Sequence, residues 1–153
     1  MSHSKTGALI VFARSSSLQD LVDVGVKLDA RVKSELLETI FKRDTPLHDG
    51  AVVIRNNRIV AASCYLPISQ NPNLSSVFGT RHRAAVGISE TNNVFVIVVS
   101  EETGRISIAQ NGNLTSGLSI QKLRAEMEEL FGGGQMDEED VGFSSEKGDL
   151  EIK

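Results

Sequence analysis

Several residue types that define common protein classes are scarce in this sequence. Its 153 residues include one cysteine, three prolines, one tyrosine and no tryptophan. The single cysteine, Cys64, excludes an internal disulfide framework and is typical of proteins in a reducing compartment. The longest apolar runs, such as 94–99, have about six or seven residues, whereas a membrane-crossing helix needs roughly 20. The first ten residues also lack the layout of a signal peptide.

The sequence signatures of the most common ligand sites are missing as well. The chain has no CxxC pair and only three scattered histidines, so we do not expect a structural zinc site. It lacks the GxxxxGKS/T phosphate loop, a GxGxxG fingerprint after the first strand, the GxSxG elbow and HExxH. With no basic run interleaved with aromatic residues, the sequence also argues against nucleic acid as a partner.

The residues that are present indicate one globular domain followed by an acidic tail. Hydrophobic residues make up 40% of the chain and charged residues 24%. Residues 126–153 carry ten acidic and two basic side chains, a balance of −8, which leaves +4 for residues 1–125. A mildly basic body suits small polyanions such as nucleotides, and equally an ordinary protein surface. We place the domain at 1–131 and interpret 132–153 as a flexible or loosely docked tail, either a regulatory segment for a protein partner or a solvated extension.

Apolar patterning predicts an alternation of strands and helices. Strands are predicted at 6–13, 26–28, 51–55, 59–66, 94–100 and 105–109, with Asn56-Asn57 suited to a tight hairpin. Helices are predicted between an N-cap at 15–17 and Gly25, over 30–43, over 81–89 with Thr80 as N-cap, and from Ile120 to Phe131. Strands that are joined by hairpins and alternate with helices indicate an α/β or α+β fold, a mixed sheet covered by helices on its faces.

The first candidate motif is His48-Asp49-Gly50-Ala51, which runs directly into a predicted strand. A carboxylate beside a glycine at a strand entrance can hold a divalent cation, and the glycine lets a phosphate or sugar approach the backbone. His48 adds a nitrogen ligand for a metal such as Mn²⁺. The alternative is a plain turn in which Asp49 caps its own backbone.

The second candidate motif is GTRHRAA, residues 79–85, at the predicted start of a helix. Free N–H groups at a helix N-terminus favour anions, and arginine forks match phosphate oxygens. Because cations there oppose the helix dipole, an anionic ligand would remove a local conflict. The small Ala84 and Ala85 would let this helix pack closely on the sheet. The alternative is a basic helix end on the surface.

Three further features have two interpretations each. In the Ser100-Glu101-Glu102 turn either glutamate could help to coordinate a metal, or the turn is an exposed acidic hairpin tip. Tyr65-Leu66 offers an apolar edge for a base, or is simply core and strand end. Cys64 is interpreted as a buried small hydrophobe, because no basic neighbour favours a reactive thiolate.

Taken as a set, the motifs resemble the paired DGA and RHR signatures of the diadenylate cyclase (DAC) domain family. The flanking segments TPLHDGAVVI, AASCYLPIS, GTRHRAAVGISE and VVSEETGRIS extend the resemblance over roughly residues 6–120. The histidine before DGA and the SEETG segment are similar to the membrane-anchored, CdaA-type bacterial branch rather than to the DNA-scanning branch. That branch normally begins with transmembrane helices, so we expect either a truncated soluble catalytic domain or a chain that lacks the anchor.

The resemblance implies an enzyme that condenses two ATP into cyclic di-AMP and two pyrophosphates. It implies a divalent metal (Mn²⁺, Mg²⁺ or Co²⁺) and a mixed, roughly seven-stranded sheet flanked by helices on both faces. It further implies a face-to-face homodimer, and for the full-length protein a place on the cytoplasmic face of the bacterial membrane. The competing hypotheses are a non-catalytic sensor of ATP or cyclic dinucleotides, a metal-dependent phosphodiesterase and a structural adaptor.

The resemblance also assigns roles to individual residues. Asp49 would take the metal and help to activate the 3′-hydroxyl, and His48 would be an additional metal ligand. Leu66 would meet the adenine edge through its backbone, with Tyr65 packing nearby. The remaining residues would contact the ribose, the phosphates or the bound metal: Gly50, Ala51, Thr80, Arg81, His82, Arg83, Ala84, Ser100 and Glu102.

Overall fold

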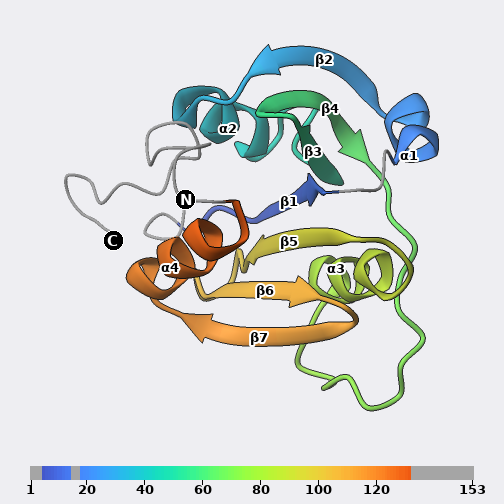
Figure 1. Ribbon diagram of the computed structural model, residues 1–153, viewed down its shortest axis with the longest axis vertical. Coiled ribbons are helices and arrows are strands. Elements are labelled where there is room, and N and C mark those ends of the chain that lie inside the picture. The colour runs from blue at the N-terminus through green and yellow to red at the C-terminus, as the bar shows by residue number, and fades with distance from the viewer. Residues whose placement is uncertain (1–4, 15–17, 132–153) are drawn as a thin grey trace.

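Seven strands form one sheet in the computed structural model, which describes residues 5–14 and 18–131 (Figure 1). The strand order is β2-β4-β3-β1-β5-β6-β7, so that β2 and β7 are the two edges. β1 and β3 run parallel, and the other five neighbouring pairs in the described residues are antiparallel. This is the mixed sheet that the sequence predicts. The strands are β1 (Ala8–Ala13), β2 (Val26–Arg31), β3 (Ala51–Arg55), β4 (Arg58–Cys64), β5 (Val94–Val99), β6 (Ile106–Gln110) and β7 (Asn113–Leu118).

In the described residues, four helices cover the two faces of this sheet and enclose two hydrophobic cores. They are α1 (Gln19–Val24), α2 (Ser34–Phe41), α3 (Thr80–Thr91) and α4 (Ile120–Phe131). Because successive side chains of a strand point to opposite faces, β1 contributes Ile10 and Phe12 to the core under α2 and α4. It contributes Leu9 and Val11 to the core under α1 and α3. The prediction of helices on both faces is confirmed.

The central strands are apolar throughout because both of their faces are covered. All six residues of β5 are buried, as are the first five of β1. Strands buried on both faces have continuous hydrophobic runs rather than alternating ones, which explains why these two were readily found in the sequence. Phe12 and Phe95 pack across the β1–β5 pair with ring centroids 6.2 Å apart.

The ends of several elements differ from the predictions. The second strand reaches Arg31 because it pairs with β4, so α2 begins at Ser34 rather than at 30. Helix α3 has Gly79 as its N-cap, so the prediction of Thr80 in that position is wrong. Leu18 is the N-cap of α1, and the seryl N-cap predicted at 15–17 lies outside the described residues, as does the tail at 132–153.

The turns show both what the sequence predicted and what it missed. Asn56 and Asn57 join β3 to β4 with φ of 53° and 63°, which confirms the predicted tight hairpin. β7 was not predicted, because four of its six residues are exposed and it carries no apolar run. Within residues 5–14 and 18–131, no helix is long and apolar enough to cross a membrane.

Candidate active site

The predicted motifs meet at one edge of the sheet because of the strand register. β1 and β3 run parallel with Ile10 opposite Val52, so the residues that precede the two strands emerge together. β5 runs antiparallel to β1 with Val99 opposite Ala8, which brings the turn after β5 to the same edge. β4 ends there too, since Cys64 pairs with Ala51. The segments HDG, SEETG and YLP therefore surround the start of β1.

Asp49 lies exposed at this edge, with its carboxylate near the end of β4. The hydroxyl of Tyr65 donates to Oδ2 of Asp49 at 3.3 Å, and Ser63 Oγ donates to the Asp49 carbonyl at 2.9 Å. Gly50 has φ of 92°, and a Cβ on it would lie 3.0 Å from the Cys64 carbonyl oxygen. Glycine is therefore needed for the backbone to pass β4 closely while it presents the carboxylate outward.

His48 is oriented by a hydrogen bond to the backbone. Its Nδ1 donates to the carbonyl of Thr45 at 2.8 Å, and in the neutral ring this leaves the lone pair on Nε2. Metal-binding histidines commonly hold their other ring nitrogen in this way. No cluster of three or more His, Cys, Asp or Glu that could hold a metal exists in the described part of the chain. A cation at this edge would take His48 and Asp49 as its protein donors, and its remaining ligands would have to come from phosphate and water.

Arg81 brings the first turn of α3 to the same edge. Its guanidinium lies against the backbone of Gly7, where a Cβ would be 2.7 Å from Cζ. Its Nη1 donates to Oε1 of Glu101 at 2.6 Å, and the other Glu101 oxygen lies 3.6 Å from Nη2 of Arg43. The hydrogen bond and charge of Arg81 lower the pKa of Glu101 despite its slight desolvation, and Arg43 and His48 contribute in the same direction. A positively charged group therefore faces the sheet edge that carries Asp49.

The three residues of the RHR segment point in different directions, because each helical residue is turned by about 100° from the last. His82 stacks on Phe78 with ring centroids 4.9 Å apart, and burial together with the charge of Arg81 lowers its pKa. Arg83 Nη2 donates instead to the carbonyl of Ser75, in the loop between β4 and α3. Arg81 is thus the member of the segment that reaches the edge.

Other predicted site residues have structural tasks that limit how they can meet a ligand. Ala51 and Ala84 are buried in the core under α1 and α3, so only their backbones are available. Ala84 and Ala85 let α3 pack on the sheet, as predicted. Ser100 Oγ accepts hydrogen bonds from the amides of Glu102 and Thr103 and so closes the turn after β5.

The remaining predicted residues differ in their exposure to solvent. Thr80 and Glu102 are exposed, and Leu66 is partly buried against the same core as Ala84. Tyr65 is 62% exposed. Cys64 is fully buried, and burial raises the pKa of its thiol to about 11, which confirms the interpretation as an inert hydrophobe.

Sequence reasoning missed two contributors to the edge, Gly7 and Arg43, and the resemblance assigned Glu102 rather than Glu101 to the site, whereas Glu101 is the acid that pairs with Arg81. A lone glycine before a strand and a lone arginine after a helix carry no distinctive signal. Glu101 was visible as one of a pair of acids, but which of two adjacent side chains in a turn faces the arginine is decided by the turn geometry. The hydrogen bonds of Ser100 to the amides that follow set that geometry.

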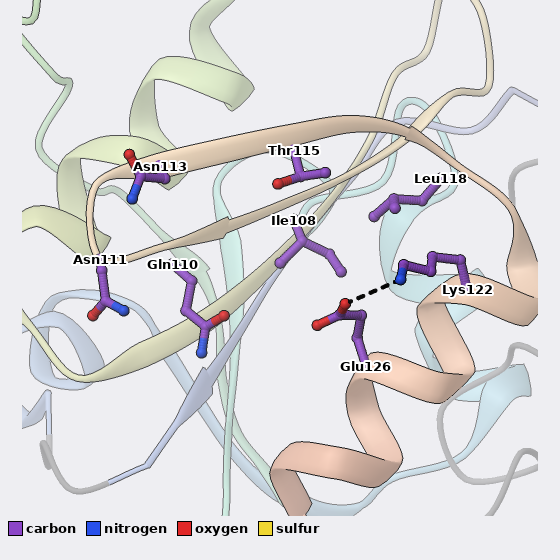
Figure 2. A pocket seen from close by; sticks show the side chains of 8 residues that line it. All are labelled: Ile108, Gln110, Asn111, Asn113, Thr115, Leu118, Lys122 and Glu126. Carbon is purple, nitrogen blue, oxygen red and sulfur yellow. Dashed lines mark ion pairs between the residues drawn. The ribbon is translucent and has the colours of Figure 1, made fainter.

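A separate cavity of about 230 Å³ lies over β6, β7 and α4 (Figure 2). Figure 2 shows Lys122 and Glu126 of α4 facing it from one side, joined by an ion pair of 3.7 Å, with Ile108 and Thr115 of the strands on the other. None of the predicted site residues lines it. The cavity is therefore distinct from the edge that carries Asp49 and Arg81.

Comparison with protein families gives an independent result. Residues 1–114 match the DAC family model, described as DisA bacterial checkpoint controller nucleotide-binding. The chain belongs to the DAC family. A match over residues 1–114 includes the HDGA, YLP, RHR and SEETG segments that meet at the sheet edge.

Individual DAC relatives agree with this assignment. The chain is 49% identical over 131 residues to the cyclic di-AMP synthase CdaA of Bacillus subtilis. This alignment covers 86% of this chain and 48% of the relative. It is 49% identical to a diadenylate cyclase of Listeria monocytogenes, covering 80% of this chain and 45% of that protein. The chain therefore spans about half the length of these curated relatives.

Solved structures are similar as well. A crystal structure of a double mutant of DacA from Staphylococcus aureus has a TM-score of 0.83 and 44% identity, covering 84% of this chain and 86% of that one. A hypothetical membrane spanning protein from Bacillus cereus has a TM-score of 0.73 and 47% identity, covering 76% of this chain and 57% of that one. At such identities the DAC fold of the chain is shared in detail.

Proposed function

We propose that this chain is the catalytic domain of a diadenylate cyclase, which condenses two ATP into cyclic di-AMP and releases two pyrophosphates. The observation that carries the proposal is the convergence of Asp49 and the Arg81 guanidinium on one sheet edge, around the start of β1. A carboxylate and an arginine fork are the two groups that a nucleotidyl transfer needs, one for the attacking hydroxyl and one for the phosphates. The names of the curated relatives support the same reaction.

The proposed chemistry forms two phosphodiester bonds. Each 3′-hydroxyl oxygen attacks the α-phosphorus of the other ATP, the bond from that phosphorus to the oxygen that bridges to the β-phosphate breaks, and pyrophosphate leaves. Asp49 helps to activate the attacking hydroxyl by accepting its proton, while Arg81 offsets negative charge on the triphosphate. A divalent cation (Mn²⁺, Mg²⁺ or Co²⁺) held by His48 and Asp49 would supply further charge neutralisation when bound.

The other predicted residues complete the nucleotide site in this proposal. Gly50 and the backbone of Ala51 lie against the ribose and phosphates, and the backbone of Leu66 meets the adenine. Thr80, His82 and Arg83 belong to the phosphate-binding start of α3. Ser100 acts by shaping the turn that presents the neighbouring acids.

Because each chain contributes one such edge, two chains must face each other for both bonds to form. We therefore propose a homodimer as the active species. Exposed apolar side chains support it: Ile68 is 46% exposed and Val77 is 82% exposed, both in the loop between β4 and α3. We also propose that the domain works at the cytoplasmic face of the bacterial membrane.

Incubation of the protein with ATP and Mn²⁺, followed by mass analysis of the products, tests the proposal. We expect cyclic di-AMP and two pyrophosphates for each product molecule. If the protein binds ATP but the ATP is recovered unchanged, the protein is a sensor and not a cyclase. Consumption of added cyclic di-AMP would point instead to a phosphodiesterase.

A further inference from the structure

The carboxylate of Glu101 occupies the position that the proposed function gives to a phosphate. Its Oε1 accepts a 2.6 Å hydrogen bond from Nη1 of Arg81, the length expected of a charge-assisted bond. The Arg81 side chain is 25% exposed, and its guanidinium is packed over Gly7. A carboxylate and a phosphate compete for the same guanidinium N–H groups.

Glu101 has a second cation to which it can turn. Its Oε2 lies 3.6 Å from Nη2 of Arg43, which follows α2 and is itself largely exposed. If a phosphate replaces the carboxylate on Arg81, Glu101 keeps Arg43 as a partner. The exchange therefore leaves no charge unpaired, which makes the Arg81–Glu101 contact suited to repeated opening.

We propose that Glu101 is the resident counter-ion of Arg81, which the triphosphate of an entering ATP displaces, and that it thereby sets the affinity of the site for phosphate ligands. This inference rests on the proposed function, since it takes ATP as the ligand and Arg81 as its anchor. It assigns Glu101 the role of a counter-ion. The acidic turn by itself also suggests a different role, metal binding. The lowered pKa of Glu101 is consistent with it, because the competitor stays ionised at neutral pH.

The consequence is measurable without turnover. An exposed ion pair contributes about 0.2–1 kcal/mol, so removing the competitor tightens binding of a phosphate ligand by about fivefold at most. Glu101→Gln should strengthen ATP binding in EDTA, measured by isothermal titration calorimetry at low salt. Adenosine has no phosphate and should bind both proteins equally. Glu128→Gln removes an exposed negative charge from α4 and is the matched control, with no change expected.

Other outcomes would overturn the inference in different ways. Equal or weaker ATP binding by Glu101→Gln in EDTA shows that the carboxylate is no competitor. Unchanged binding in EDTA but weaker binding with Mn²⁺ identifies Glu101 as a metal ligand instead. If ATP binds neither the unsubstituted protein nor the variants, with or without Mn²⁺, the proposed function itself fails. If Arg81→Ala does not weaken ATP binding, Arg81 is not the anchor on which the competition depends.

Discussion

The hydroxyl of Tyr65 donates to Oδ2 of Asp49 across 3.3 Å, which ties the end of β4 to the turn before β3. The contact is long for an O–H···O hydrogen bond, so it orients the carboxylate without fixing it. Tyr65 is 62% exposed and Asp49 is exposed as well. The carboxylate is therefore available to a ligand and contributes little to the fold. Its chemical role can be separated from any contribution to stability.

Asp49→Asn tests this separation. The amide has the same shape and can still accept from Tyr65, but it carries no negative charge and cannot take a proton. We expect product formation to fall by at least about a hundredfold, while circular dichroism and the unfolding midpoint change little. ATP binding through Arg81 should persist. Asp44→Asn is the matched control, an exposed acid at φ of 68°, where asparagine is well tolerated, and it should leave activity unchanged.

Gly7→Ala should weaken ATP binding, and only because it displaces the Arg81 guanidinium. The new Cβ would lie 2.7 Å from Cζ and 2.9 Å from Nη1, so the guanidinium must move, and as the far end of a flexible side chain it can do so without unfolding the protein. We expect ATP affinity to fall by about tenfold to a hundredfold, the loss of one charge-assisted hydrogen bond. In an Arg81→Ala background the same change should have no effect. Equal losses in both backgrounds would place the effect elsewhere.

The strands and helices that the sequence predicted best are those whose burial is continuous or strictly periodic. β1 and β5 follow from unbroken apolar runs, and α4 from apolar residues at helical spacing. β7 had no such run, yet Asn111-Gly112 before it adopts φ of 55° and 79° and is the sequence signature of a tight hairpin.

The candidate site was predictable in its parts and not in its contacts. The HDGA and GTRHRAA motifs could be found because each combines a special backbone residue with charge. That Arg81 rather than Arg83 reaches the sheet edge depends on the direction in which α3 begins, with Gly79 as its N-cap. Ala84 and Ala85 lie in the core under α1 and α3, and the sequence pattern alone does not specify the direction in which α3 crosses the sheet.

Gly87→Ala should destabilise the protein although alanine is the better helix former by about 1 kcal/mol. A Cβ at Gly87 would overlap the carbonyl oxygen of Pro67, and it would lie 3.0 Å from the Ser69 amide nitrogen. That amide donates to the Arg83 carbonyl at 3.0 Å, so the loop rests on α3 at this point. We expect the free energy of unfolding to fall by about 1–3 kcal/mol, measured in urea. Gly79→Ala, with no atom within 4 Å of its Cβ, should change it by about 1 kcal/mol or less.

His82 should make the stability of the protein depend on pH near neutrality. Burial and the adjacent charge of Arg81 lower the pKa of His82 below its ordinary value of about 6.5. Between the two pKa values the unfolded chain binds more protons than the folded one, so the free energy of unfolding must fall as the pH falls through that window. Above it both states are neutral and the contribution vanishes. Glu101, also with a lowered pKa, acts only below the ordinary glutamate value of about 4.3 and so does not interfere.

His82→Gln removes this titration while keeping a planar polar side chain at the start of α3. Urea unfolding of both proteins between about pH 7.5 and pH 5.5 should show the unsubstituted protein losing stability relative to the variant as the solution is acidified. Parallel pH profiles would mean that the folded protein accepts the proton on His82 as readily as the unfolded chain does. In that case the neutral imidazole that burial and the Arg81 charge favour would not be the form present at the start of α3.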